Sequence, residues 1–257
     1  MFERKHHNSN VCKADFCTMK RIAVSLLLCV AFTTISAQPA KQGQQIAVQG
    51  SSQGVAACIS CHGAKGEGIG AFPRLAGTGE AYLLAQLDAF ANGARKNPIM
   101  QPIAQSLQPS ERQAVVMYFS QLRAPLLAVD LKQPLTTDTG AWLATRGRLA
   151  DQVPACMQCH GPGGSGVGAQ FPPLAGLPAA YIAEQLQAWK AGNRPPGPLA
   201  LMAGVAKKLS DAEITAVAAY YEKIALPERT GIPDVPGAVG APGVMSPEAP
   251  TRTKGAP

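Results

Sequence analysis

Apolar residues recur along this chain at the three- and four-residue spacing of an amphipathic α-helix, and they do so in matched stretches. The pattern predicts helices over residues 80–91 and 178–190, because each stretch gathers its large apolar side chains on one face. Shorter stretches at 43–50 and 140–149 predict a leading helix for each set. The apolar positions of the two long stretches are Tyr82, Leu83, Leu87 and Phe90, and Tyr181, Ile182, Leu186 and Trp189.

A further helix near the end of each set is predicted by a capping box, in which a serine precedes a Gln or Glu by three residues. The two boxes are Ser110 with Gln113 and Ser210 with Glu213. The segments between the predicted helices are rich in Gly and Pro, which favour loops. The expected fold class is therefore all-α.

The two sets of helices belong to an internal duplication. Residues 72–77 read Phe-Pro-Arg-Leu-Ala-Gly, and residues 171–176 read Phe-Pro-Pro-Leu-Ala-Gly. The repeated unit is roughly 90 residues long, which indicates a duplicated domain and not a short-period solenoid. We expect one domain over residues 38–128, a linker over 129–139 and a second domain over 140–226. Further matched residues are Gln86, Gly93, Arg95 and Tyr118 in the first copy and Gln185, Gly192, Arg194 and Tyr220 in the second.

The two ends of the chain differ from the repeats. An apolar run from Ile22 to Phe32 follows two basic residues and precedes a cleavage pattern of small residues ending at Ala37, so residues 1–37 are predicted to be a signal peptide. Met19 offers an alternative start, since it opens a signal peptide of ordinary form, and Cys29 weakly suggests a lipoprotein signal. Residues 227–257 are rich in Pro and Gly and are predicted to be disordered.

The charge of the chain excludes one class of function. Five of its 23 basic and two of its 16 acidic residues lie in residues 1–37, so 18 basic and 14 acidic residues remain, a net charge of +4. No basic helix or arginine run with interleaved aromatic residues appears, so nucleic-acid binding is not expected. After Ala37 no apolar stretch is long enough to cross a membrane.

The candidate chemistry lies in two copies of Cys-x-x-Cys-His, at residues 58–62 and 156–160. This pattern is the attachment signature of c-type haem. Each pair of thiols, Cys58 with Cys61 and Cys156 with Cys159, can form thioethers to the two vinyl groups of one haem, and His62 or His160 can bind its iron. We therefore predict two covalently bound haem c groups. Haem attachment in bacteria takes place outside the cytoplasmic membrane, which agrees with the predicted signal peptide.

Other uses of a Cys-x-x-Cys pair are a thioredoxin-like redox site or part of a zinc site. After residue 37 every Cys and His of the chain lies inside one of the two motifs, so no further ligands remain for zinc. The two motifs could together form one four-cysteine zinc site. That arrangement would leave both adjacent histidines unexplained, so haem attachment is the favoured interpretation.

The second axial ligand of each iron decides between electron transfer and catalysis. Bis-histidine ligation is excluded, because only His62 and His160 remain after residue 37. Met100 and Met202 occupy matched places in the two copies, in what we expect to be proline-bearing loops, and are the predicted ligands. The other methionines considered are Met117, expected to pack in the core, Met157, inside its own motif, and Met245, in the tail.

These motifs together resemble the dihaem cytochrome c4 family. The resemblance rests on Cys-x-x-Cys-His-Gly, Pro-x-Leu-Ala-Gly, Tyr-x-x-x-Gln-Leu and Met-x-x-(Ile/Val)-Ala, in that order and in two copies, between about residues 43 and 226. It implies two tandem class I cytochrome c domains with His/Met ligation, packed about a pseudo-twofold axis. The chain departs from the family at Thr78 and Leu177, which stand where glutamine is usual, in the longer loop 194–201 and in its long tail.

The resemblance also implies a function: an electron carrier of the periplasmic respiratory chain, not an enzyme, which donates electrons to a terminal oxidase. The expected partners are redox proteins, and the upstream partner is a cytochrome complex or a dehydrogenase. Peripheral association with the membrane is also expected. No small-molecule substrate is expected. One alternative is a cytochrome subunit of a periplasmic dehydrogenase complex. Another is a dihaem peroxidase, which would need one open iron.

Overall fold

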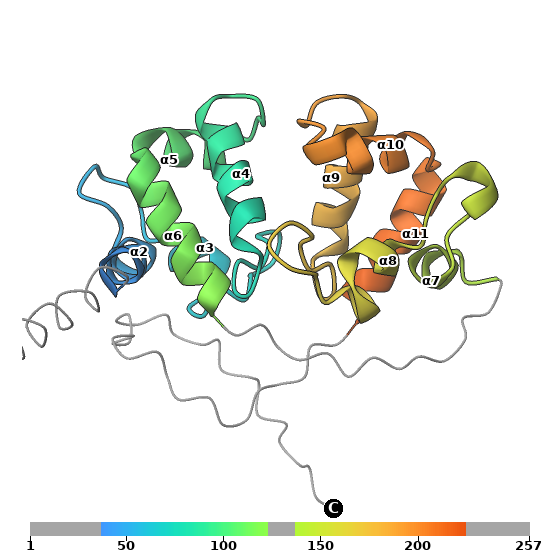
Figure 1. Ribbon diagram of the computed structural model, residues 1–257, viewed down its shortest axis with the longest axis horizontal. Helices are drawn as coiled ribbons and strands as arrows, with labels where there is room; N and C mark the ends of the chain where they lie inside the picture. The colour runs from blue at the N-terminus through green and yellow to red at the C-terminus, as the bar shows by residue number, and fades with distance from the viewer. Residues whose placement is uncertain (1–36, 123–136, 225–257) are drawn as a thin grey trace, which may run out of the picture.

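The computed structural model describes residues 37–122 and 137–224, and in these residues it is helical, with isolated β-bridges and no strand. The chain forms two halves of similar shape, with α4 of the first half facing α9 of the second (Figure 1). The first half contains α2 (Ala37–Gln49), α3 (Ile59–His62), α4 (Glu80–Ala91), α5 (Met100–Ser106) and α6 (Pro109–Gln121).

The second half repeats this order. It contains α7 (Thr139–Thr145), η1 (Leu149–Asp151), α8 (Cys156–His160), η2 (Pro162–Gly164), α9 (Ala179–Lys190), η3 (Pro198–Ala200), α10 (Leu201–Lys207) and α11 (Asp211–Glu222). The expectation of two tandem all-α domains is therefore confirmed. The helix predicted over 80–91 is confirmed with the same bounds, and that over 178–190 begins one residue later.

The first and last helices of each half cross at a glycine. A Cβ atom on Gly43 of α2 would lie 2.0 Å from the carbonyl oxygen of Ala114 on α6. In the second half a Cβ on Gly140 of α7 would lie 2.3 Å from the carbonyl oxygen of Ala216 on α11. No side chain fits at either distance, so glycine allows the two backbones to meet. This contact sets how closely the first and last helices of each half pack.

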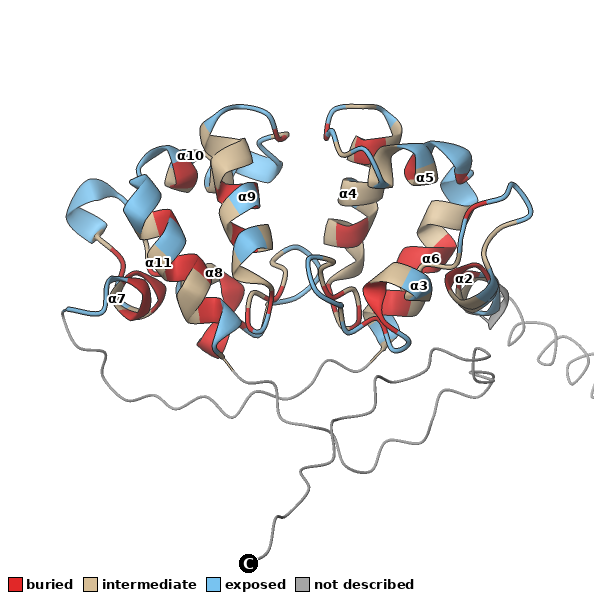
Figure 2. Cartoon of the chain, turned by 180° about the vertical axis from the view of Figure 1, so that it is seen from behind, coloured by how far each residue is buried: buried red, intermediate tan, exposed pale blue. Residues whose placement is uncertain are grey.

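Each half has its own apolar core. Figure 2 shows buried positions on α2, α6, α7 and α11, where these helices cross. Phe119 on α6 and Tyr221 on α11 occupy matched places and are each 1 % exposed. The aromatic rings that precede them, Tyr118 and Tyr220, meet them edge to face at 5.2 Å between centroids in both halves. The duplication seen in the sequence therefore extends to the packing of the core.

Three details of the sequence-based prediction were wrong. The capping box of α6 is formed by Gln108 and Glu111, with the Gln108 amide donating to Glu111 Oε2 at 2.8 Å, because Pro109 occupies the first turn and Ser110 lies inside the helix. The helix expected over 140–149 ends at Thr145 and is followed by η1. The loops expected at Met100 and Met202 are the first turns of α5 and α10.

The predicted signal peptide (apart from Ala37), most of the linker and all of the predicted tail lie outside the described residues. Within residues 37–122 and 137–224, no helix is long and apolar enough to cross a membrane. The two halves make direct contact in addition to their chain connection: the backbone amide of Tyr82, on α4, donates to the carbonyl of Ala169 at 2.9 Å.

Candidate haem sites

Each Cys-x-x-Cys-His motif forms one short helical turn that points its histidine inwards. In the first half the His62 amide donates to the Cys58 carbonyl at 3.0 Å, and the His62 carbonyl accepts from the Gly68 amide at 2.7 Å. In the second half the His160 carbonyl accepts from the Gly166 amide at the same distance. Both histidines are 6 % exposed. The motif therefore places two thiols and one imidazole on the same side of a rigid turn.

The orientation of each histidine ring is fixed by a proline carbonyl. Nδ1 of His62 lies 2.7 Å from the oxygen of Pro73, and Nδ1 of His160 lies 2.7 Å from the oxygen of Pro172. A carbonyl only accepts, so Nδ1 carries the proton and Nε2 is left as an unprotonated ligand. Burial lowers the pKa of both imidazoles, against a smaller opposite effect of these hydrogen bonds, and keeps them neutral.

The four thiols of the motifs are partly buried and are not paired as disulfides. Burial raises the pKa of the Cys58 and Cys156 thiols to about 11. A thioredoxin-like pair needs a thiol with a lowered pKa, so that interpretation is not supported. The two motifs do not combine into a zinc site, since the described residues contain no group of three or more His, Cys, Asp or Glu placed to hold a metal.

The sulfur atoms expected on the opposite side belong to Met100 and Met202, and both residues line the same cavity as the motifs. Asn97 Oδ1 accepts from the amides of Ile99 and Met100, at 3.0 and 2.9 Å, and thereby starts α5. In the second half Trp189 Nε1 donates to the Pro195 carbonyl at 2.9 Å and fastens the longer loop before α10. Met117 and Met157 do not line the cavity, and Met245 lies outside the described residues.

One cavity runs through both halves, and its lining is mainly apolar. The apolar lining from α4, α6, α9 and α11 includes Leu83, Leu87, Val116, Ile182, Leu186 and Val217. A large flat macrocycle that excludes water suits such a lining. The residues present therefore fit the cofactor that the motifs predict: thiols for covalent attachment, a neutral imidazole and a thioether for iron, and apolar walls for the ring.

Two buried arginines meet where the halves join. Arg95 is 8 % exposed and its Nη2 donates to Oε1 of Gln185 at 2.6 Å, while Arg194 is 5 % exposed and its Nη2 donates to Oε1 of Gln86 at 2.9 Å. Neither has a carboxylate partner among the described residues. Burial lowers the pKa of Arg194, and the like charge of Arg95 adds to that effect. Haem carries two carboxylates, so a haem in each half would supply the missing negative charge.

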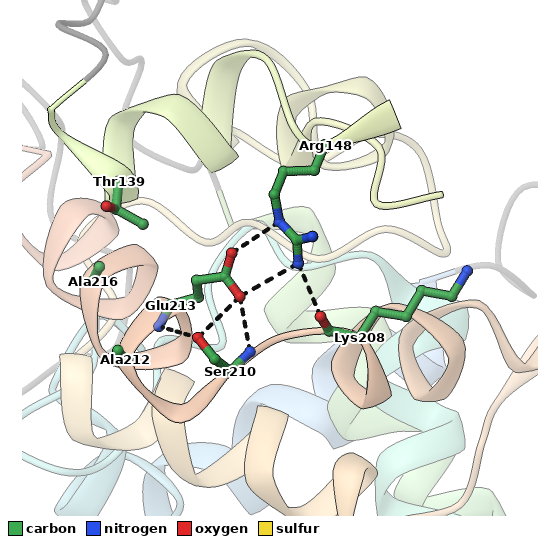
Figure 3. Close-up of a pocket in the computed structure, with 7 residues that line it drawn as sticks. All are labelled: Thr139, Arg148, Lys208, Ser210, Ala212, Glu213 and Ala216. Carbon is green, nitrogen blue, oxygen red and sulfur yellow. Dashed lines mark hydrogen bonds and ion pairs between the residues drawn. The ribbon is translucent and has the colours of Figure 1, made fainter. Parts of the chain in front are cut away.

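A shallow depression beside α11 has a structural explanation. Figure 3 shows Arg148 reaching Glu213, with Nε to Oε1 at 2.9 Å, and the Lys208 carbonyl, at 2.9 Å from Nη2. Ser210 completes the cluster as the N-cap of α11, since its hydroxyl accepts from the Glu213 amide at 3.2 Å. The predicted capping box of the second copy is thus confirmed. These groups bind one another, so the depression is explained by the contacts that fix the start of α11.

Comparison with known proteins agrees with this geometry. The family model described as Cytochrome c matches residues 40–123 and 148–224. The chain is 46 % identical over 188 residues to the "Thiosulfate dehydrogenase electron acceptor" of Stutzerimonas stutzeri strain A1501, covering 72 % of this chain and 87 % of that protein. It is 36 % identical over 216 residues to cytochrome c4 of Stutzerimonas stutzeri, covering 79 % of this chain and 99 % of that protein.

Solved structures show the same relationship. Reduced recombinant cytochrome c4 from Pseudomonas stutzeri matches with a TM-score of 0.59 and 34 % identity, over 72 % of this chain and 97 % of that one. The thiosulfate dehydrogenase TsdBA from Marichromatium purpuratum, in its as-isolated form, matches with a TM-score of 0.65 and 40 % identity, over 76 % of this chain. This chain spans 44 % of that longer protein.

Two cytochrome c folds, each with its own attachment motif, make this protein a dihaem c-type cytochrome, and cytochromes of this class carry electrons. Its relatives that align over nearly their whole length are cytochromes c4. The chain accordingly belongs to the dihaem cytochrome c4 family. The prediction of two covalently bound haem c groups is thereby confirmed.

Several residues of the cavity had no role assigned from the sequence. Gln86, Arg95, Gln185 and Arg194 appeared there only as markers of duplication, yet all four line the cavity. A polar residue that recurs within an apolar helical face is the signal that could have identified the glutamines. Arg74 and Thr78 gave no such signal, because neither recurs in the second copy.

Proposed function

We propose that this protein accepts electrons from a thiosulfate dehydrogenase in the periplasm and passes them through its two haems towards a terminal oxidase. The observation that carries the proposal is its 46 % and 44 % identity to two proteins named thiosulfate dehydrogenase electron acceptor, over 87 % and 77 % of their lengths. The fold also matches part of TsdBA. The predicted signal peptide supports the periplasmic location.

In this proposal each half supplies a complete set of bonds to one haem. Cys58 and Cys61 would form the thioethers of the first site, and His62 and Met100 would bind its iron. Cys156 and Cys159, with His160 and Met202, would do the same in the second. The geometry that supports these roles is the shared lining of one cavity by all eight residues and the fixed orientation of both imidazoles.

When bound, each haem supplies one iron that alternates between the ferric and ferrous states. The protein keeps the surroundings of that iron unchanged as the charge changes. Pro73 and Pro172 hold the imidazole rings in place, and the crossings at Gly43 and Gly140 let the first and last helices of each half pack closely. The apolar walls exclude water, so little solvent has to reorient when an electron arrives.

A direct test uses the oxidised, haem-loaded protein with thiosulfate and the purified thiosulfate dehydrogenase of Stutzerimonas stutzeri. We expect rapid growth of the reduced haem absorption bands, about two electrons per chain, only when enzyme and thiosulfate are both present. The cytochrome c4 of the same organism is the matched comparison. If this protein is reduced by dithionite but not by enzyme and thiosulfate, the assignment of the donor is wrong.

A second candidate function is that of a general carrier to a terminal oxidase, independent of thiosulfate. The similarity to cytochromes c4, at 32–36 % identity, favours it. The reduced protein would then be reoxidised by membranes that contain a terminal oxidase, and a respiratory cytochrome complex would reduce it as fast as the dehydrogenase does. Comparison of the two reduction rates on one preparation separates the candidates.

A further inference from the structure

The two haem pockets differ at one corner, where the first half contains two buried polar side chains without partners. Arg74 is 6 % exposed and Thr78 is 3 % exposed, and both line the cavity. Arg74 makes no hydrogen bond or ion pair with the described residues, and its Nε is fully enclosed. The hydroxyl of Thr78 is likewise enclosed and unpaired.

The second half has apolar residues at the matched positions. Pro173 replaces Arg74 and Leu177 replaces Thr78, while the backbone keeps its course: the amide of Thr78 donates to Leu75, and that of Leu177 to Leu174, both at 3.1 Å. The second pocket contains one enclosed hydroxyl that the first pocket lacks. It belongs to Tyr221, and Phe119 occupies the matched position in the first half. That group is neutral, so only the first pocket gains a charge.

A buried guanidinium without an anion is costly, because it loses its hydration and receives nothing in return. Burial lowers the pKa of Arg74 to about 10, so the group is still a cation at neutral pH. The only acid among the described residues that line the cavity is Glu184, an exposed residue on α9 of the other half. The described residues therefore supply no anion to Arg74, whereas a haem in the cavity would bring two carboxylates.

We propose that Arg74 and Thr78 bind a propionate of the first haem and thereby raise the reduction potential of that haem alone. A guanidinium and a hydroxyl offer several donors to one carboxylate, which suits a buried anion. A fixed positive charge stabilises the reduced, less positive iron over the oxidised one, and the effect is strong where water is excluded. Arg74 also directly follows Pro73, whose carbonyl orients His62, so its charge lies on the segment that sets this iron ligand.

Arg95 and Arg194 cannot produce such a difference, because they are matched in the two halves and each hydrogen-bonds across the boundary. Arg74 and Thr78 belong to one half only. The consequence is that the protein can hold its two irons at different potentials although their predicted ligands are the same. This inference needs both haems in place, but it does not depend on which protein donates the electrons.

The test measures both reduction potentials of the full dihaem protein by spectroelectrochemical titration, with the two haems distinguished by their methyl signals in proton NMR. In Arg74→Leu we expect the equilibrium constant for reduction of the first haem to fall about tenfold, ~59 mV for one electron, while that of the second stays unchanged. Arg74→Lys, which keeps the charge, should leave the reduction potential of the first haem close to its wild-type value. Thr78→Val should give a smaller fall at the same haem.

Lys41→Leu is the matched control, since it removes one positive charge from an exposed position on α2 of the same half. An equal fall in Lys41→Leu and Arg74→Leu, an equal fall at both haems, or no change in Arg74→Leu would each overturn the proposal. If Arg74→Leu does not mature with two haems, Arg74→Lys and the isosteric Thr78→Val decide. The local contact is contradicted if Thr78→Val leaves the potential of the first haem unchanged and Arg74→Lys lowers the potentials of both haems equally.

Discussion

Nη2 of Arg95 and Oε1 of Gln185 lie 2.6 Å apart across the boundary between the two domains. Arg95 follows α4 of the first domain, and Gln185 is a buried residue of α9 in the second. A matched contact runs in the opposite direction: Arg194 of the second domain donates to Gln86 and to the hydroxyl of Tyr82 in the first, both at 2.9 Å. Each domain therefore completes the polar edge of the other's pocket.

Removal of the Gln185 side chain should lower the stability of the whole protein. In Gln185→Ala the buried guanidinium of Arg95 loses its shortest hydrogen bond, so we expect the free energy of unfolding to fall by about 2 kcal/mol. The measurement is denaturant unfolding of the dihaem protein. Gln42→Ala, at an exposed position of α2, is the control and should change stability little. Equal effects of the two substitutions would show that the contact between domains contributes nothing.

Haem content is expected to follow the attachment motifs one by one. Mass spectrometry of the purified protein should show the signal-cleaved chain plus two haem masses, because each motif supplies two thiols. Replacing both cysteines of one motif, as in Cys156→Ala with Cys159→Ala, should remove one covalent haem. Haem that is extracted by acid acetone from the wild-type protein would contradict the assignment.

The predicted methionine ligands can be tested by the absorption spectrum. The oxidised protein should show the weak near-infrared band of a methionine bound to ferric haem. Met100→Ala and Met202→Ala should each remove about half of that band and open one iron to carbon monoxide, because no other methionine among the described residues lines the cavity. Met117→Ala is the control and should keep the full band. Loss of the band in that variant would show that Met117 is a ligand instead.

The crossing of α2 and α6 should tolerate no side chain. In Gly43→Ala the new Cβ would lie 2.0 Å from a backbone oxygen, so the helices must separate, at a cost of about 2 kcal/mol. Gly204→Ala is the matched control, since Gly204 lies in α10 with nothing within 4 Å of the added atom. There alanine should stabilise the protein by about 0.5 kcal/mol. Thermal unfolding of both variants checks the contrast.

Peroxidase activity should be negligible in the wild-type protein. If each iron binds the predicted histidine and methionine, hydrogen peroxide has no free position to bind. The protein should nevertheless exchange electrons quickly with redox mediators. The assay follows peroxide-dependent oxidation of the reduced protein, with Met202→Ala as a variant expected to gain a little activity. Substantial turnover by the wild type, with its methionine band intact beforehand, would favour the dihaem peroxidase.

The sequence by itself determined the class of protein, the number of haems and the positions of α4 and α9. These features are local: five consecutive residues define an attachment site, and the period of apolar residues defines a helix such as α4. Duplication added a second, independent copy of each observation. The choice of Met100 and Met202 also came from this matching, and as ligands they stay a prediction, although both line the cavity.

Only the tertiary structure decided how the polar groups are partnered. The N-cap of α6 is Gln108 and not the predicted Ser110. Pro109 occupies the first turn and Glu111 binds the Gln108 backbone amide, so Ser110 lies inside the helix. The link from Arg95 to Gln185 joins residues of different domains, and no local pattern encodes it. The isolation of Arg74 is likewise invisible in the chain, since a buried charge is recognised only when everything around it is known.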